Sequence, residues 1–118
     1  MARSNRTTEL AEYERRYREL AGELAEIGLI ASGSVTRRST RCSTPGCHCH
    51  ADPPQLHGPY AQWTTKVGGK TVTRRLSERE AEIYQEWIAN DRQLRAVVAE
   101  MREIAAKAEA IILQDAVA

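Results

Sequence analysis

Apolar residues at both ends of the chain recur at alternating spacings of three and four, which is the repeat of an amphipathic helix with a heptad seam. Near the N-terminus the intervening residues are mostly Glu and Arg, and Gly28 and Gly33 follow the last repeat. Strong helix formers fill this run, and glycine commonly ends a helix. The pattern predicts a first helix over about residues 8–27, with its seam at Leu10, Tyr13, Tyr17, Leu20, Leu24 and Ile27.

A second, longer helix is predicted after Ser77, which forms a capping box with Glu80 three residues later. No Gly or Pro interrupts residues 78–114. The apolar stripe of this helix is longer and wider than the first helix can cover. An antiparallel helix pair within one chain is the simpler arrangement, and we favour the addition of a second copy, giving a homodimer through the helices. The seam positions are Trp87, Leu94, Val98, Met101, Ala105, Ala108 and Ile112.

Between the helices, the runs "YAQWTTKV" and "KTVTRRL" alternate as strands do and are joined by Gly68-Gly69, a two-residue hairpin loop. That turn sets Val67 opposite Lys70 and Ala61 opposite Leu76, which makes one face mostly apolar. A third strand is expected in "GSVTRRST". The predicted fold is α+β, with a small three-stranded antiparallel module between the two helices. Its polar, basic face holds Tyr60, Gln62, Thr64, Lys66, Thr71, Thr73 and Arg75.

Charge is distributed unevenly along three predicted segments, residues 1–32, 33–77 and 78–118, which we expect to form one structural unit. The first segment carries 5 basic and 6 acidic residues, the middle one 7 and 1, and the last one 5 and 9. The formal net charge of +1 therefore conceals a strongly basic centre. Such asymmetry favours binding to a polyanion.

All three cysteines and all three histidines lie in "RCSTPGCHCHADPPQLHGPY", residues 41–60. A structural zinc ion takes four such ligands, and we predict Cys42, Cys47, Cys49 and His57. His48 lies between two ligand cysteines and in an extended stretch would point away from them, and His50 directly follows Cys49 and would be strained as a partner. His57 can return freely to the cysteines, although its replacement by either of the other two stays open. Free thiols or redox-active thiols are the alternatives. A closed four-ligand site would have a structural role, because it leaves no position for a reactive water.

The remaining sequence features limit the class of protein to which the chain can belong. Three cysteines cannot all pair, and "MARSNRTTEL" lacks the apolar core of a signal peptide, so we expect a cytoplasmic protein. No apolar run is long enough for a membrane span. No carboxylate pair, nucleophile with a base, or phosphate loop accompanies the histidines, so we do not expect an enzyme.

The basic centre suggests nucleic-acid binding. We predict a DNA-binding accessory or regulatory factor for recombination, transposition or transcription, with RNA as an open possibility. The alternative is a coiled-coil adaptor that docks a larger protein and has a zinc head without nucleic-acid binding. The predicted contact residues are Arg37, Arg38, Arg41, Gln62, Thr64, Lys66, Lys70, Thr73, Arg74 and Arg75.

Four stretches, "TRRSTRCSTPGCHC", "HGPY", "GGKTVTRRL" and "SEREAEIYQEWIANDRQLR", resemble a family of short bacterial proteins of unknown function, often encoded near mobile genetic elements. The resemblance covers about residues 33–95 and implies no particular activity. It implies that the family pattern includes Cys42, Cys47, Cys49, His57, Gly58, Pro59, Tyr60, Gly69, Lys70 and Arg74.

Overall fold

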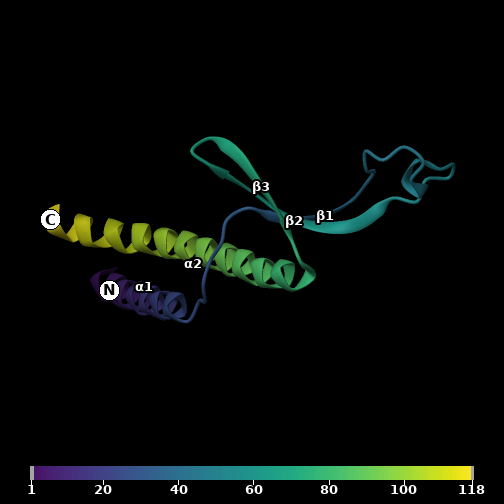
Figure 1. Cartoon of the computed structure of the whole chain (residues 1–118). Coiled ribbons are helices and arrows are strands. Elements are labelled where there is room, and N and C mark those ends of the chain that lie inside the picture. Colours follow the sequence, from purple (N-terminus) through teal and green to yellow (C-terminus); the bar gives the residue numbers. More distant parts are fainter. Residues whose placement is uncertain (1, 118) are drawn as a thin grey trace. The chain divides into compact units, whose positions relative to one another are not determined.

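The computed structural model describes residues 2–117 and confirms the predicted α+β fold (Figure 1). The chain divides into two compact units, the β module Leu29–Ala89 and a helix pair from the described parts of Met1–Gly28 and Asn90–Ala118. The last helix contributes to both units. In chain order the elements are α1 Ala2–Ala25, β1 Ser34–Thr40, the short 3-10 helix η1 His48–His50, β2 His57–Val67, β3 Lys70–Leu76 and α2 Glu78–Val117.

The three strands form one antiparallel sheet in the order β1-β2-β3. In the hairpin, Val67 pairs with Lys70 and Ala61 pairs with Leu76, as the Gly68-Gly69 turn predicts. The predicted third strand is also present, with Val35 opposite Trp63 in the β1–β2 ladder. The hairpin and its register therefore follow directly from the turn.

One face of the sheet packs against the first turns of α2. The core residues Ala61, Leu76 and Ala81 are at most 5% exposed. The rings of Trp63 and Tyr84 lie beside them, with centroids 4.8 Å apart. Aromatic contact at this distance adds to the stabilisation from apolar burial. This packing gives the sheet an inner, core-facing side and an outer side.

Both helices are longer than predicted, although α1 ends at Ala25, two residues before its predicted end. Helix α2 begins with the predicted capping box: the Glu80 N–H donates to Ser77 Oγ over 3.1 Å, and the Ser77 N–H donates to Glu80 Oε1 over 3.0 Å. Helix α1 starts at Ala2 rather than near residue 8, because residues 2–7 contain no helix breaker and Arg6 pairs with Asp115 of α2. No helix within residues 2–117 combines the length and apolarity needed to cross a bilayer.

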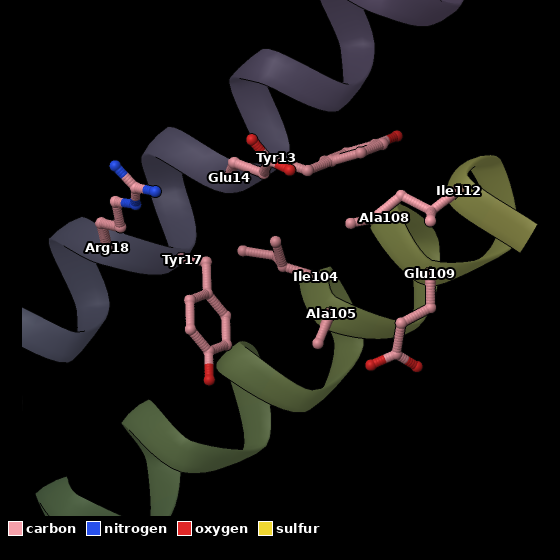
Figure 2. Close-up of a pocket in the computed structure, with 9 residues that line it drawn as sticks. All are labelled: Tyr13, Glu14, Tyr17, Arg18, Ile104, Ala105, Ala108, Glu109 and Ile112. Atoms are coloured by element: carbon pink, nitrogen blue, oxygen red, sulfur yellow. The ribbon is translucent and has the colours of Figure 1, made fainter.

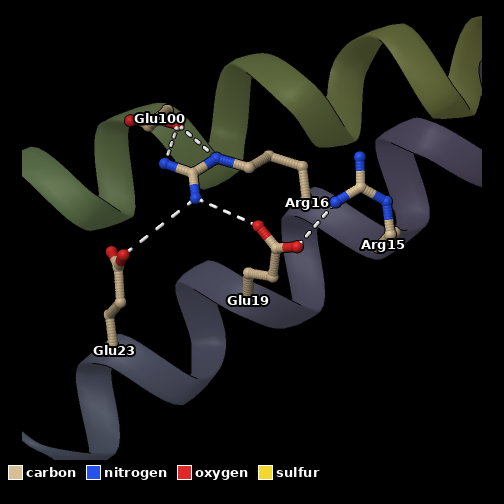
Figure 3. A network of polar contacts seen from close by, with 5 residues as sticks. All are labelled: Arg15, Arg16, Glu19, Glu23 and Glu100. Carbon is tan, nitrogen blue, oxygen red and sulfur yellow. Dashed lines mark hydrogen bonds and ion pairs between the residues drawn. The ribbon is translucent and has the colours of Figure 1, made fainter.

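In the helix pair, α1 lies antiparallel to the second half of α2. Arg16 of α1 forms an ion pair with Glu100 of α2 over 2.9 Å and also contacts Glu19 and Glu23 (Figure 3). Figure 2 shows Tyr13 and Tyr17 extending from α1 toward α2 on another part of the interface. Among the described residues of this unit, the side chains less than a tenth exposed are Leu20, Val97 and Ala108.

Candidate metal centre and polar sheet face

The four predicted ligands come together in one cluster. The Sγ atoms of Cys42, Cys47 and Cys49 and a ring nitrogen of His57 all lie within 4.8 Å of one another. The Cys42 and Cys49 sulfurs are 3.5 Å apart, and the Cys47 sulfur is 3.3 Å from His57 Nε2. A zinc ion with bonds of about 2.3 Å to tetrahedral sulfur ligands separates them by about 3.8 Å. The donor type and spacing therefore fit a single metal ion.

Two tight turns bring the cysteines together. The Cys47 N–H donates to the Thr44 carbonyl over 3.3 Å, closing a turn over Pro45 and Gly46. The His50 N–H then donates to the Cys47 carbonyl over 2.9 Å as η1 begins. This 3-10 turn accommodates the unusual one-residue spacing between Cys47 and Cys49. It also buries Cys49 completely.

A β-bulge brings His57 to the cluster. Arg38 pairs with Tyr60, but Thr40 pairs with His57, so β2 has one residue more than β1 at this point. The extra residue is accommodated at Gly58, where φ is +104° and an added Cβ would lie 2.9 Å from the Arg38 carbonyl oxygen. Glycine is the residue that tolerates both conditions. The bulge thus fixes where β2 begins and where His57 lies.

The other two histidines lie nearby but outside the four-residue group. His50 Nε2 is 2.7 Å from the Cys42 carbonyl oxygen. The His48 ring lies beside that of His57, with centroids 5.1 Å apart and the ring planes tilted by 58°. An extended backbone at His48 was the expected reason for its exclusion, and that expectation is wrong, because His48 begins the 3-10 turn. The predicted set of four is nevertheless the one that the fold assembles.

The electrostatic environment differs between the two closest cysteines. A hydrogen bond from the backbone of Thr44 lowers the pKa of Cys42 to about 6, with His57 and Cys49 acting in the same direction. Burial raises the pKa of Cys49. The Cys42 N–H lies 3.4 Å from Cys49 Sγ and donates to it. Because thiolate is the ligand form of cysteine, Cys42 is prepared for metal binding at neutral pH.

The predicted contact residues of the sheet are divided between its two faces. Strand alternation puts Arg37, Lys70 and Arg74 on the inner side, whereas Arg41 is exposed in the loop before Cys42. The outer side is called the polar sheet face below. It comprises Ser34, Thr36, Arg38, Tyr60, Gln62, Thr64, Lys66, Thr71, Thr73 and Arg75, with three basic residues and no acidic one.

The two inner arginines interact with groups on α2. Arg37 donates to both carboxylate oxygens of Glu78, over 3.2 and 2.9 Å, and this hydrogen bonding lowers the pKa of Glu78. Arg74 donates to the Tyr84 hydroxyl over 2.9 Å and lies 3.9 Å from a Glu80 carboxylate oxygen. Position in the chain alone does not distinguish these arginines from the other basic residues of the centre, because all seven are close in the sequence.

The basic residues of the polar sheet face are placed differently. The guanidinium of Arg75 lies over the Tyr60 ring, 4.0 Å from its centroid. The hydroxyls of Thr64 and Thr73 are 3.3 Å apart across the β2–β3 ladder. Within residues 5–117, whose side chains are described, no carboxylate forms an ion pair with Arg38, Lys66 or Arg75. Their charges are therefore available to an external anion.

A comparison with protein-family models matches residues 10–85 to a domain of unknown function, DUF6788. This match spans most of α1, the cysteine cluster, the whole sheet and the start of α2. The chain belongs to the DUF6788 family. Comparison with curated proteins and with solved structures found no significant match. Membership of an uncharacterised family agrees with the resemblance seen in the sequence, and DUF6788 assigns no activity to the site.

Proposed function

We propose that this DUF6788 protein binds duplex DNA through its polar sheet face. One observation supports the proposal above all: the fold separates the basic residues into two classes. Arg37 and Arg74 interact with α2, whereas Arg38, Lys66 and Arg75 lie on a face without a carboxylate. A basic face that served only solubility would not require this separation.

The chemistry of the polar sheet face suits a groove of DNA. Arg38 lies opposite Tyr60 at one end, and Lys66 lies six residues further along β2, roughly 20 Å away. That distance is enough to straddle the major groove, which is about 12 Å wide. Uncharged Gln62 and Thr64 lie between the two ends. In this arrangement the end cations contact phosphates and the central side chains reach base edges.

We also propose that the cluster of Cys42, Cys47, Cys49 and His57 binds zinc with a structural role. Three thiolates and one imidazole are a common tetrahedral zinc set, and four protein ligands leave no open coordination position. A bound ion would link the loop after β1 to the beginning of β2. These are the strands that carry Arg38 and Tyr60, so the metal would hold one end of the DNA-binding face in place.

The biological role that we propose is that of a dimeric accessory or regulatory factor without enzymatic activity of its own. Recombination or transposition would agree with the resemblance to proteins encoded near mobile elements, and transcription is the other setting. An adaptor without nucleic-acid binding is the competing function. The two differ in whether phosphates are bound, so salt dependence separates them.

The test is fluorescence anisotropy of labelled duplex DNA, single-stranded DNA and duplex RNA, titrated with metal-loaded protein between about 50 and 200 mM salt. We expect the tightest binding to duplex DNA, with log affinity falling linearly against log salt. Arg75→Ala should flatten this slope by about one unit, since one phosphate contact is lost. Lys66→Ala should do the same.

Arg74→Ala is the matched control, because Arg74 is the adjacent arginine on the same strand but lies on the inner face. It should leave the salt slope unchanged, provided that its melting curve shows a folded protein. Equal effects of Arg74→Ala and Arg75→Ala would contradict the assignment to the polar sheet face. Absence of binding to every nucleic acid at low salt would favour the adaptor.

A further inference from the structure

An apolar groove runs along the helix pair between α1 and α2. Its larger part has a volume of about 380 Å³, and Figure 2 shows Tyr13 and Tyr17 on one side with Ile104, Ala108 and Ile112 on the other. A second hollow of about 210 Å³ adjoins it, and Tyr17 and Ala105 line both. Tyr17 is 40% exposed and Ile112 is 46% exposed, although both occupy seam positions.

The groove follows the heptad seam of α2. Val98, Met101, Ala105, Ala108 and Ile112, at spacings of three and four, all line one of the two hollows. In a two-stranded coiled coil such positions are enclosed by the partner helix. Here the seam is open to solvent on one side, as it would be in one helix pair of a four-helix bundle without the second pair.

Charges on the rim of the groove identify the partner. Glu14 and Glu109 line the end near Tyr13, and Arg18 lines the same hollow one turn further along α1. Arg102 lines the adjoining hollow. Lys107 lies over the Tyr13 ring, 5.9 Å from its centroid, and still leaves that end net negative. One end is therefore acidic and the other basic, so a copy turned by a two-fold axis places unlike charges together.

We propose that a second copy of this chain occupies the groove, with the two helix pairs packed as an antiparallel four-helix bundle. This inference gives a location to the dimer of the proposed function. Its test measures oligomeric state alone, so either proposal can fail without the other. The apolar seam supplies the attraction, and the polarised rim selects the antiparallel arrangement over the parallel one.

Sedimentation equilibrium of the metal-loaded chain over a concentration series tests the proposal. We expect a dimer at tens of micromolar, and Ala105→Arg should raise the dimer dissociation constant at least tenfold by placing a charge in the groove. Ala106→Arg is the matched control, because this neighbouring residue is exposed and does not line either hollow. It should leave the dimer unchanged. Helical circular dichroism verifies that each variant is folded.

A charge reversal on the exposed rim keeps the test valid if Ala105→Arg fails to fold. Arg18→Glu should weaken the dimer about tenfold, since the symmetric interface contains the altered contact twice. Adding Glu14→Arg to it should restore most of the affinity by exchanging the two signs. A helical monomer at these concentrations overturns the proposal, and so does a dimer that tolerates both Ala105→Arg and Arg18→Glu.

Discussion

Arg75 stacks on Tyr60, with the guanidinium carbon 4.0 Å from the centre of the ring. The two residues come from adjacent strands and lie on the polar sheet face next to the end that leads into the cysteine cluster. A guanidinium that is already held over an aromatic ring loses less conformational freedom on binding an anion than a mobile guanidinium does. Under the proposed function, the stack would therefore prepare Arg75 for a phosphate contact.

We predict that Tyr60→Leu weakens DNA binding while affecting stability only slightly. Loss of an exposed cation–π contact costs about 0.5–1 kcal/mol. Anisotropy titrations and thermal melts of the same protein samples measure the two effects. Tyr60→Phe keeps the ring and should bind DNA like the wild type. Equal affinity of Tyr60→Leu and Tyr60→Phe would show that the stack has no part in binding.

The second prediction concerns the metal ligands. Cys47→Ser and His57→Ala should each abolish stoichiometric zinc binding, because both side chains belong to the group of four. His48→Ala should retain the ion, although its ring is next to that of His57. Metal content after dialysis, measured by elemental analysis, separates these variants. Retention by His57→Ala together with loss from His48→Ala would transfer the fourth ligand to His48.

Much of the β module was predictable because local rules determine it. The Gly68-Gly69 turn sets the register of β2 and β3, and Ser77 and Glu80 mark the start of α2. The ligand set was predictable because the cysteines and histidines are confined to one short segment and only His57 is far enough from Cys49 to return freely. These features depend on neighbours in the chain.

The other features of the fold and of the candidate site depend on contacts between residues that are far apart in the sequence. Local sequence patterns do not reveal such contacts. The side of the sheet to which Arg37 and Arg38 point follows from their pairing with Ala61 and Tyr60 of β2. The ion pair of Arg37 with Glu78 joins residues 41 positions apart. The 3-10 turn at His48 likewise forms within a loop that neither helical nor strand periodicity describes.

A third prediction concerns Gly33, which precedes β1 and has a φ of +95°. An added Cβ there would lie 2.3 Å from the Thr64 carbonyl oxygen and 2.9 Å from Trp63 Nε1. Trp63 Nε1 also donates to the Ser32 carbonyl over 2.8 Å, so the ring cannot move without loss of that bond. Gly33→Ala should therefore lower the free energy of unfolding by more than about 2 kcal/mol.

Gly68→Ala serves as the comparison for Gly33→Ala in urea unfolding. Gly68 also has a positive φ, +57°, but an added Cβ would have no atom within 4 Å. Only the backbone preference is lost there, so we expect a decrease of about 1–2 kcal/mol. Similar losses at Gly33 and Gly68 would mean that the loop before β1 relaxes and that the close approach to β2 is not maintained.

The final prediction concerns the capping box at the start of α2. Ser77→Ala should lower the free energy of unfolding by about 1 kcal/mol, because the Glu80 N–H loses its acceptor. Glu80→Gln should cost less at neutral pH, since an amide oxygen can still accept from the Ser77 N–H. Urea unfolding of both variants beside the wild type measures these differences.

The pH dependence distinguishes the charge of Glu80 from its hydrogen bond. The backbone N–H of Ser77 lowers the pKa of Glu80 below its ordinary value of 4.5. A carboxylate with a lowered pKa in the folded state stabilises the protein above that ordinary value, and the contribution disappears as the pH falls through the lowered pKa. The stability difference between wild type and Glu80→Gln should therefore be constant from pH 7 to about pH 5 and shrink in more acidic solution. Because both proteins are compared at each pH, metal release in acid affects them equally. A stability difference that persists unchanged below the lowered pKa would mean that the carboxylate charge contributes nothing to the cap.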